Sequence, residues 1–369
     1  MSRLDFDRAR ISSIDFKMNL SPRESSEHES LSMMDPTDDS IFTAGLDDVT
    51  TMSKILHELH HVDDDSVLVL TRDGFRLITA GEKTFQVSAF FAASAFQRFK
   101  FDGDSYDKVN FRFVLKDFIE SLNLLRDDPI VEGDKIQQDD TGQPSDLMKT
   151  SLYIQYRKKG DPLKLRLENK SNYVINCDLK AFNLPSDSMF CPLNFLDGEE
   201  TAVIVLNSRK FYDYVSGLDL VSSDLVHLVM GRGDVPIKLS TKSTLLGQVE
   251  LEITQNETDI IKKGITVSDN CLFSFSYKTQ FMKPALEALR NSALMQMKCG
   301  SSGLLCIEHF HPVDRASRDG LCLRPDNGYV ATQISSDAIM TDYNQPQNKR
   351  SSVEYFILSE AKPIDACSD

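Results

Sequence analysis

Two histidines and a glutamate have the most recognisable catalytic spacing in this chain: His57, Glu58 and His61 read His-Glu-x-x-His. On a helix this spacing places two imidazoles one turn apart, where they can bind zinc while the glutamate acts as general base. The surrounding apolar residues recur at helical spacing on the opposite side, so both histidines should face solvent. A zinc peptidase also needs a third ligand and a helix that continues past His61, but the acidic run 63–65 ends the helical pattern. We therefore expect no metal, and zinc analysis after dialysis tests the alternative.

A second group of metal-binding residue types lies near the C-terminal end: Cys299, Cys306, His309 and His311. The two cysteines fall on separate predicted strands. Cys306 and His309 are three positions apart on one strand, so their side chains should point to opposite faces of the sheet. The pattern predicts no shared metal site.

Asp102, Asp104 and Asp107 begin like a calcium-binding loop, but the glycine and the closing glutamate of such a loop are missing. A solvated turn is the better interpretation. The chain also has no glycine-rich phosphate loop, nucleophile elbow or convincing carboxylate pair. We predict no catalytic residues and no cofactor.

Composition limits the class of protein. The 369 residues are 41% apolar, which is enough for two ordinary domains with their own cores. Seven scattered cysteines without paired spacing favour reduced thiols, and the absence of a long apolar run favours a soluble intracellular protein with no membrane contact. The formal charge of -15 disfavours general nucleic-acid binding unless the cations gather on one surface.

The same order of elements occurs twice. An apolar strand at 41–46 leads into a helical pattern, and a similar strand at 200–206 does the same. Each strand and helix is followed by several short strands and a second helix, which indicates an internal duplication. Helices are predicted at 47–61, 114–126, 207–218 and 278–291, with Pro284 in the first turn of the last one. Strands are predicted at 66–70, 75–80, 84–90, 106–113, 151–157, 162–167, 172–179, 224–230, 235–241, 245–253, 271–277, 294–298, 304–309 and 353–358.

Domain boundaries follow from this order. Residues 1–40 are rich in Ser, Asp and Glu and predict a disordered tail. The first domain spans 41–182, a linker with Pro and Gly spans 183–199, and the second domain spans 200–360. A polar insertion at 311–350 is too long for a hairpin turn and should be mobile. Residues 361–369 form a short tail.

The four predicted helices are less acidic than the rest of the chain. They carry eight basic and seven acidic residues, so the negative charge lies elsewhere. Their cations could form one shared surface, or they could simply be solvated helix faces. The eight cations are Lys54, Lys116, Arg126, Arg209, Lys210, Lys278, Lys283 and Arg290.

Three segments resemble a known family: Leu46 to Leu56, Asp73 to Thr79, and Gln86 to Phe99. They are similar to the Rad-one-type subunit of the eukaryotic checkpoint sliding clamp, and Ser352 to Phe356 resembles the last strand of that family. The resemblance is dense over 41–125 and thinner afterwards. The long N-terminal tail, the loop at 129–148 and the insertion at 311–350 depart from the family pattern.

The resemblance implies an α+β DNA-clamp fold, related to the proliferating cell nuclear antigen, with two duplicated domains that each place two helices on the inner face of antiparallel sheets. It also implies a heterotrimer with Rad-nine-like and Hus-one-like subunits, a dedicated clamp loader, and a ring in the nucleus around double-stranded DNA of any sequence. A helical inner wall whose cations meet phosphates without reading bases would permit sliding.

Ring closure, on the same resemblance, should use the edges of the strands at 172–179 and 245–253. Candidate packing residues at these edges are Val174, Leu246, Val249 and Leu251. Backbone pairing between subunits would cover both edges. The linker at 183–199 matches the interdomain connector, beside which clamps dock short partner peptides.

Two alternative functions stay open. A homotrimeric replication clamp should assemble from this chain alone, so sedimentation of the purified chain distinguishes it from a checkpoint subunit. A three-prime to five-prime DNA exonuclease would need several converging carboxylates for two-metal chemistry. The sequence pattern does not assemble them, and metal-dependent digestion that is lost on mutating one acidic residue would show otherwise.

Overall fold

The computed structural model describes residues 15–18, 39–60, 62–82, 84–125, 150–169, 173–184, 193–196, 199–218, 220, 222–231, 236–243, 247–254, 260–265, 273–311 and 351–360. Within them no helix is both long and apolar enough to cross a membrane. The α+β class, with short helices and antiparallel strands, is confirmed.

Four helices form where the apolar residues recur at helical spacing. They are α1 (Thr50–His60), α2 (Leu115–Asn123), α3 (Ser208–Val215) and α4 (Thr279–Glu287), and the 3-10 turn η3 (Ala288–Asn291) follows α4. The carboxylate of Asp48 accepts a hydrogen bond from the Thr50 N–H at 2.8 Å, and the Asn207 side chain accepts one from the Lys210 N–H at 3.1 Å. These contacts satisfy backbone donors that the first turn leaves without a helical partner.

The strands form three antiparallel sheets. The first has the order β1 (Asp15–Met18), β10 (Val174–Leu179), β9 (Leu163–Asn169), β8 (Thr150–Tyr156), β2 (Phe42–Leu46) and β6 (Arg98–Phe101). The second has the order β15 (Ile260–Ile265), β11 (Thr201–Asn207), β17 (Leu294–Gly300), β18 (Leu304–Phe310), β19 (Ser352–Leu358), β5 (Phe85–Ala92), β4 (Gly74–Glu82), β3 (Asp65–Thr71) and β7 (Val109–Val114). The third has the order β14 (Gly247–Ile253), β13 (Ile237–Ser243), β12 (Leu225–Met230) and β16 (Phe273–Lys278).

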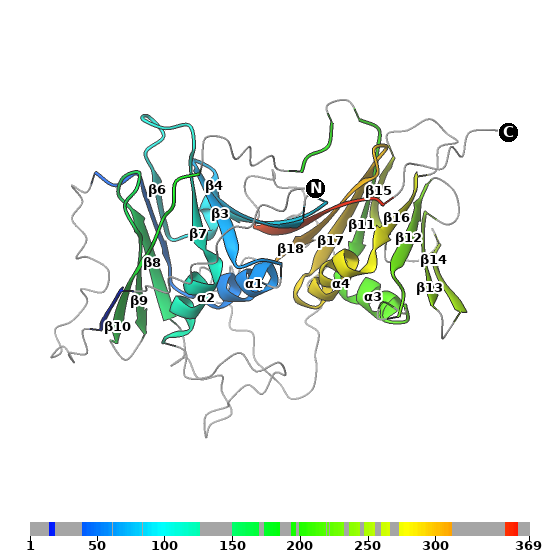
Figure 1. Cartoon of the computed structure of the whole chain (residues 1–369), viewed down its shortest axis with the longest axis horizontal. Coiled ribbons are helices and arrows are strands. Elements are labelled where there is room, and N and C mark those ends of the chain that lie inside the picture. The colour runs from blue at the N-terminus through cyan, green and yellow to red at the C-terminus, as the bar shows by residue number, and fades with distance from the viewer. Residues whose placement is uncertain are drawn as a thin grey trace, which may run out of the picture.

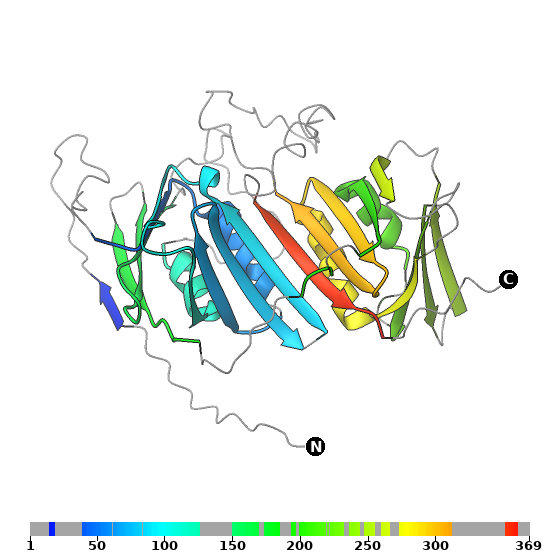
Figure 2. The same cartoon turned by 90° about the horizontal axis from the view of Figure 1, so that it is seen from above.

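The nine-stranded sheet runs through the middle of the molecule, and the other two sheets stand at its ends (Figure 1). All four helices lie on one side of this central sheet (Figure 2). Their apolar faces pack toward the strands: Met52, Ile55 and Leu56 of α1 and Phe281 and Met282 of α4 are each at most 6% exposed. Burying these side chains stabilises the fold by roughly 1.5–3 kcal/mol each.

The two repeats share one plan, which sheet order makes visible. In each repeat one group of strands follows the order β6-β2-β8-β9-β10 or β15-β11-β17-β18-β19, and a second group follows β5-β4-β3-β7 or β14-β13-β12-β16. In the middle of the molecule the first group of the second repeat joins the second group of the first repeat through β19 and β5, from Ser352 opposite Phe90 to Ile357 opposite Phe85. At the two ends of the molecule the corresponding strands, β10 and β14, have no such join within the described chain.

Three predictions about local structure need correction. Residues 15–18 form β1 within the segment that composition predicts to be a disordered tail, because an open strand edge supplies backbone partners that composition does not reveal. Strands β6 and β15 were not predicted from the sequence. Pro284 lies inside α4, beyond its first turn, and the helix changes to the 3-10 turn η3 shortly after it. The proposed insertion at 311–350 falls almost wholly outside the described residues.

Candidate nucleic-acid surface on the helical side

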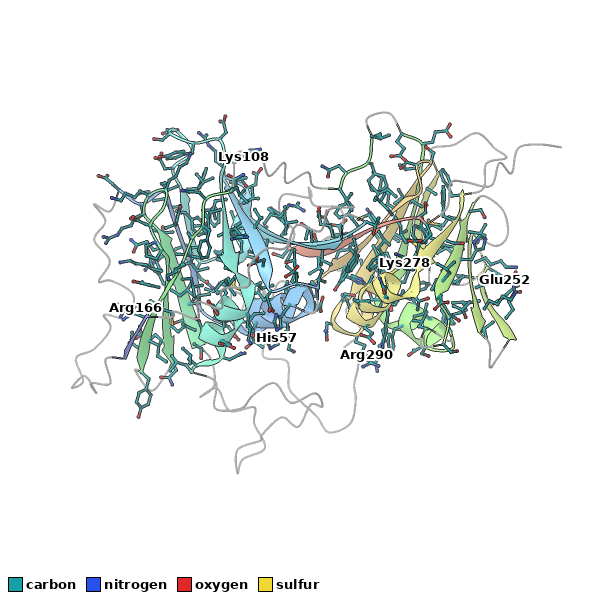
Figure 3. The ribbon with its side chains drawn as sticks, in the orientation of Figure 1. His57, Lys108, Arg166, Glu252, Lys278 and Arg290 are labelled. Carbon is teal, nitrogen blue, oxygen red and sulfur yellow. The ribbon has the colours of Figure 1, made fainter. Side chains whose placement is uncertain are left out.

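The helices present charged side chains on the side of the molecule away from the central sheet. His57 of α1 and Arg290 of η3 lie on this side, whereas Lys108 lies on the opposite side (Figure 3). Of the eight cations that the sequence proposes for this surface, seven are described and Arg126 lies outside the described residues. The seven differ in what they contact.

Two cations of the second repeat, Arg209 and Arg290, have no carboxylate partner among the described residues. Arg209 lies in the first turn of α3 and is exposed, as is Lys210 beside it. Arg290 lies over the ring of Tyr212, with its guanidinium 4.8 Å from the ring centre, and its Nε donates a hydrogen bond to the Tyr212 hydroxyl at 2.6 Å. The ring orients the guanidinium while its charge stays unneutralised, since a phenol is a neutral acceptor.

Three other proposed cations are already paired with carboxylates. Lys116 lies 3.9 Å from Glu120, Lys283 lies 3.8 Å from Glu287, and Lys278 lies 3.3 Å from Glu360. Lys278 ends β16, so it is not a helical residue, and its ammonium also lies near the Phe281 ring. Such pairs are exposed and weak. They still reduce the positive potential that a phosphate would meet.

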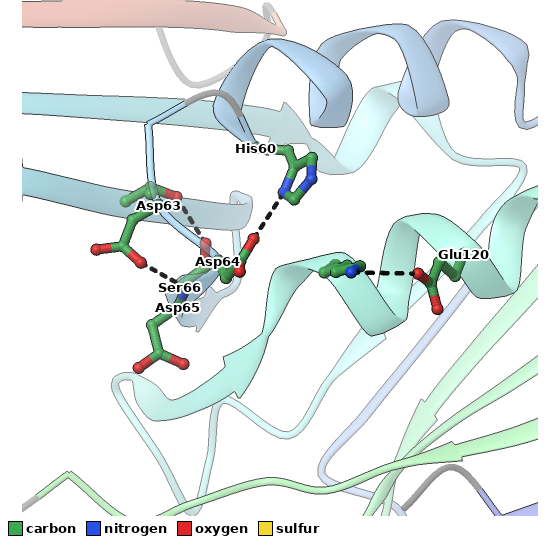
Figure 4. A network of polar contacts seen from close by, with 8 residues as sticks. His60, Asp63, Asp64, Asp65, Ser66 and Glu120 are labelled. Atoms are coloured by element: carbon green, nitrogen blue, oxygen red, sulfur yellow. Dashed lines mark hydrogen bonds and ion pairs between the residues drawn. The ribbon is translucent and has the colours of Figure 1, made fainter. Parts of the chain in front are cut away.

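In the first repeat, acidic groups lie close to helices α1 and α2. His60 ends α1 and its Nδ1 lies 3.1 Å from the Asp64 carboxylate, while Asp63 accepts a hydrogen bond from the Asp65 N–H at 3.2 Å (Figure 4). Glu120 of α2 lies nearby in the same view. Asp117, also on α2, has its pKa raised, first by burial and then by the Glu120 charge.

The expected shared cationic surface is therefore uneven. Apart from Glu58, helices α1 and α2 carry two lysines against Asp117 and Glu120, whereas α3, α4 and η3 carry four cations against Asp213 and Glu287. Lys54 of α1 is exposed and makes no ion pair with a described residue, so it is the first repeat's most available cation. Charge counting over all four helices together could not show this asymmetry.

Glu58 lies at the contact between the two repeats. One of its carboxylate oxygens accepts a hydrogen bond from the Asn291 side chain at 3.0 Å, and the other lies 3.4 Å from the Tyr355 hydroxyl, which donates to it. Both partners belong to the second repeat. Burial raises the pKa of Glu58 to about 7, and the two hydrogen bonds partly oppose that rise. No local sequence signal predicts these contacts, which join residues far apart in the chain.

The His-Glu-x-x-His motif thus has a structural Glu58, and His61 lies outside the described residues. Within the described part of the chain no group of three His, Cys, Asp or Glu side chains could hold a metal ion. Asp104 of the calcium-like turn pairs with Arg72 at 3.2 Å. The Asp102 carboxylate accepts a hydrogen bond from the Ser105 N–H at 3.4 Å.

The second metal-like group is split between the faces of the central sheet, as predicted. Cys306 packs on one face in a small cluster with Leu304 and Phe356. On the other face, His309 lies against the Tyr355 ring, with the ring centres 5.5 Å apart, and its Nδ1 is 3.1 Å from the Ser292 hydroxyl. Burial lowers the pKa of His309 to about 3 and that of His311 to about 4, so both are neutral at pH 7.

The proposed interface residues lie on the two end strands where they are described. Val174 begins β10 and is half-buried, and Val249 and Leu251 of β14 are half-buried against the core. Leu246 lies outside the described residues. Arg166 of β9 and Glu252 of β14 mark the opposite ends of the molecule (Figure 3).

Part of the predicted connector lies on the outer face of the central sheet. Leu193 and Phe195 pack against the cluster of Leu304, Cys306 and Phe356. The Lys298 ammonium lies 4.1 Å from the centre of the Phe195 ring. Leu196 next to them is 69% exposed, so the connector leaves an apolar side chain at the surface.

Comparisons with known proteins agree with this arrangement. Residues 41–311 match the family model for the repair protein Rad1/Rec1/Rad17. The DNA damage checkpoint control protein rad1 of Schizosaccharomyces pombe is 24% identical over 285 residues, which cover 74% of this chain and 81% of that relative. The structure of the PCNA2-PCNA3 complex from Sulfolobus tokodaii superposes with a TM-score of 0.56 at 13% identity, covering 86% of this chain and 99% of that one. The last match shows the clamp fold, and the first shows that the chain belongs to the Rad1/Rec1/Rad17 family of repair proteins.

Proposed function

We propose that this protein is a non-catalytic subunit of a heterotrimeric sliding clamp in the nucleus, which encircles double-stranded DNA at damage sites and recruits checkpoint and repair factors. The main supporting observation is that the two repeats share one strand order, and that β14 at one end of the molecule has a free strand edge among the described strands. The join between β19 and β5 shows how one repeat continues into the next. Pairing of β14 of one subunit with the counterpart of β10 in its neighbour would repeat that join between chains.

Such an interface is head-to-tail, because the two end strands differ. Head-to-tail contacts close into a ring when the rotation per subunit divides a full turn. The helical side of the molecule would line the ring, and Arg209, Lys210 and Arg290 on that side can contact phosphates. Contacts to phosphates alone carry no base specificity, which suits a ring that slides.

Membership of the family supports the choice of partner subunits. A Rad-nine-like and a Hus-one-like subunit would supply the other two-thirds of the ring, and a clamp loader would open it. The exposed Leu196 beside the packed connector residues supports peptide docking at this outer face. Sedimentation of the purified chain tests the alternative: a trimer of this chain alone would favour a homotrimeric replication clamp.

Topological linkage to DNA is the direct test of the function. The chain, co-purified with its two partner subunits and loaded by the clamp loader, should stay on a nicked circular plasmid at high salt and leave after the plasmid is cut. A ring that encircles DNA needs no tight contacts to stay bound. Equal retention on circular and linear DNA would contradict encirclement, and digestion of the DNA in the presence of Mg²⁺ would contradict the non-catalytic assignment.

The uneven helical surface gives a matched pair of variants for the same assay. Arg209→Ala should weaken binding to linear duplex at low salt, and should reduce the log-log salt slope by roughly 1, for one lost phosphate contact. Lys116→Ala should change the slope little, since Glu120 already pairs with that lysine. Equal effects of the two variants on the salt slope would contradict the idea that unpaired cations contact DNA more than paired ones. Ring assembly should be unchanged in both.

A further inference from the structure

Strand β1 pairs with the outer edge of β10, although about 155 residues separate them in the chain. The pairing is antiparallel and joins four positions, from Asp15 opposite Asp178 to Met18 opposite Ile175. Within the described chain β1 contacts no other strand, so its only sheet partner is β10. The N-terminal segment thus occupies the last position of the first sheet.

That position is the one where the repeat plan calls for another subunit. In the sheet order of the second repeat, β19 is the counterpart of β10, and its outer edge receives β5 over six residue pairs. An incoming subunit would place the counterpart of β14 along β10 in the same way. Because a strand edge has one row of free N–H and C=O groups, β1 and the incoming strand cannot pair with it together.

The two competing strands differ in how they are held. Strand β5 is bonded to β4 on its other side over eight residue pairs, and β14 is likewise bonded to β13 over seven. Among the described strands, β1 is bonded on one side only, over four pairs. A short strand with one neighbour is marginal, whereas a strand anchored in a sheet arrives with its conformation already fixed. The incoming strand should therefore win.

We propose that β1 is a built-in cover for the ring-closing edge: it pairs with β10 in the isolated chain and gives way to the strand of the neighbouring clamp subunit. This inference rests on the proposed function. Covering an open edge prevents unwanted strand pairing between chains. A cover that must open first also lowers the apparent affinity of the neighbour by the fraction of chains that are open.

A disulfide placed across the β1–β10 pair tests the cover. Lys17 lies opposite Asn176, and facing residues of antiparallel strands have Cα atoms at a distance that a disulfide can bridge. The full-length chain with Lys17→Cys and Asn176→Cys should crosslink within one molecule on mild oxidation. Lys17→Cys with Glu250→Cys on β14 is the matched control and should not crosslink, because β14 lies at the other end of the molecule.

Assembly with the two partner subunits is then measured for the oxidised and the reduced forms. The oxidised variant should fail to join the ring, and reduction should restore assembly. Removing residues 1–38 should instead speed assembly, by about tenfold if one chain in ten is open at any time. Assembly of the oxidised variant at the parent rate, or no crosslink at all, would overturn the cover. Failure of the parent and truncated chains to assemble under any condition would overturn the proposed function, and the cover with it.

Discussion

The join in the middle of the molecule and the open strand at its end are built from equivalent parts but bonded differently. Arg76 of β4 and Lys238 of β13 hold the same place in their repeats, since they face Val69 of β3 and Val229 of β12 respectively. Arg76 hydrogen-bonds Ser88 of β5 at 2.8 Å and also Glu354 of β19, across the join.

At the end of the molecule the equivalent cation pairs with the adjacent strand of its own repeat. Lys238 lies 2.8 Å from Glu250 and 3.1 Å from Glu252, both on the adjacent strand β14. Both carboxylates of the end strand therefore share one lysine within the subunit, and one of the two negative charges is not offset by it. The backbone edge of the strand has no partner among the described strands, so a neighbouring subunit could supply strand pairing and apolar contact there.

Aromatic packing shows the same contrast. Phe85 of β5 stacks on Phe281 of α4 with ring centres 4.8 Å apart, so a side chain of the first repeat packs on a helix of the second. Counting along the strand pairs places Gly247 of β14 where Phe85 stands in β5. Gly247 is exposed and has a φ of +76°, a conformation that favours glycine. The Phe85 side chain thus stabilises the middle join, and the end strand has no aromatic side chain at this position.

Removing the Phe85 ring should destabilise the chain strongly. Phe85→Ala should lower the free energy of unfolding by about 4 kcal/mol, through lost burial and the cavity left against Phe281. Val249→Ala is the comparison at the open end, two residues along β14 from the position that corresponds to Phe85. Its side chain is only half-buried, so the loss should stay under about 1 kcal/mol. Urea unfolding of both variants, followed by circular dichroism, makes the comparison.

Similar losses for Phe85→Ala and Val249→Ala would contradict the idea that the middle join is a core and the end is not. A double-mutant cycle of Phe85 and Phe281 sharpens the result. If the two rings stabilise each other, their coupling energy should reach about 1 kcal/mol.

The carboxyl group at the repeat contact gives a smaller, pH-dependent effect. The pKa of Glu58 is about 7 in the folded chain and close to 4.5 when unfolded. Between these values the folded state keeps a proton that the unfolded state has released, so stability falls as the pH rises from about 4.5 to 7. Glu58→Gln removes this charge and keeps an acceptor for Asn291. It should raise the free energy of unfolding by about 2 kcal/mol at pH 8 and change it little at pH 4.5.

Unfolding curves of the parent and Glu58→Gln chains at several pH values measure this difference. His309 and His311 act with the opposite sign, because burial lowers their pKa values to about 3 and 4 and folding is therefore weakened as the pH falls below 6.5. Both histidines are present in either chain, so the difference between the curves isolates Glu58. A constant difference across the pH range would contradict the raised pKa.

The duplicated order of strands and helices could be predicted from the sequence, because each element carries its own apolar period. The helix over 278–291 and the strands on either side are found close to their predicted places. Residues that act through partners far along the chain could not be found this way. Arg290 and Tyr212 are 78 positions apart, and Glu58 and Tyr355 are 297 apart.

The candidate surface was predictable only as a set of helical cations. Whether a lysine is available depends on its neighbours in space, as Lys278 shows by pairing with Glu360. The strand β1 illustrates the same limit from the other direction. Its four residues have no strong strand pattern of their own, and they form a strand because β10 offers an edge.

The equivalent cations at the join and at the end give the smallest effect and the closest matched pair. Arg76→Ala should lower the free energy of unfolding by about 1–2 kcal/mol, because Glu354 is only 12% exposed in its side chain and would keep its charge without this partner. Lys238→Ala should leave the unfolding midpoint unchanged, since Glu250 and Glu252 are exposed and water can replace the lysine. Adding Glu354→Gln to Arg76→Ala should recover part of the loss, because it removes the unpaired carboxylate charge of Glu354. If Lys238→Ala costs as much as Arg76→Ala, the end strand is as firmly bonded as the middle join, and a neighbouring subunit would have to break those contacts to pair with it.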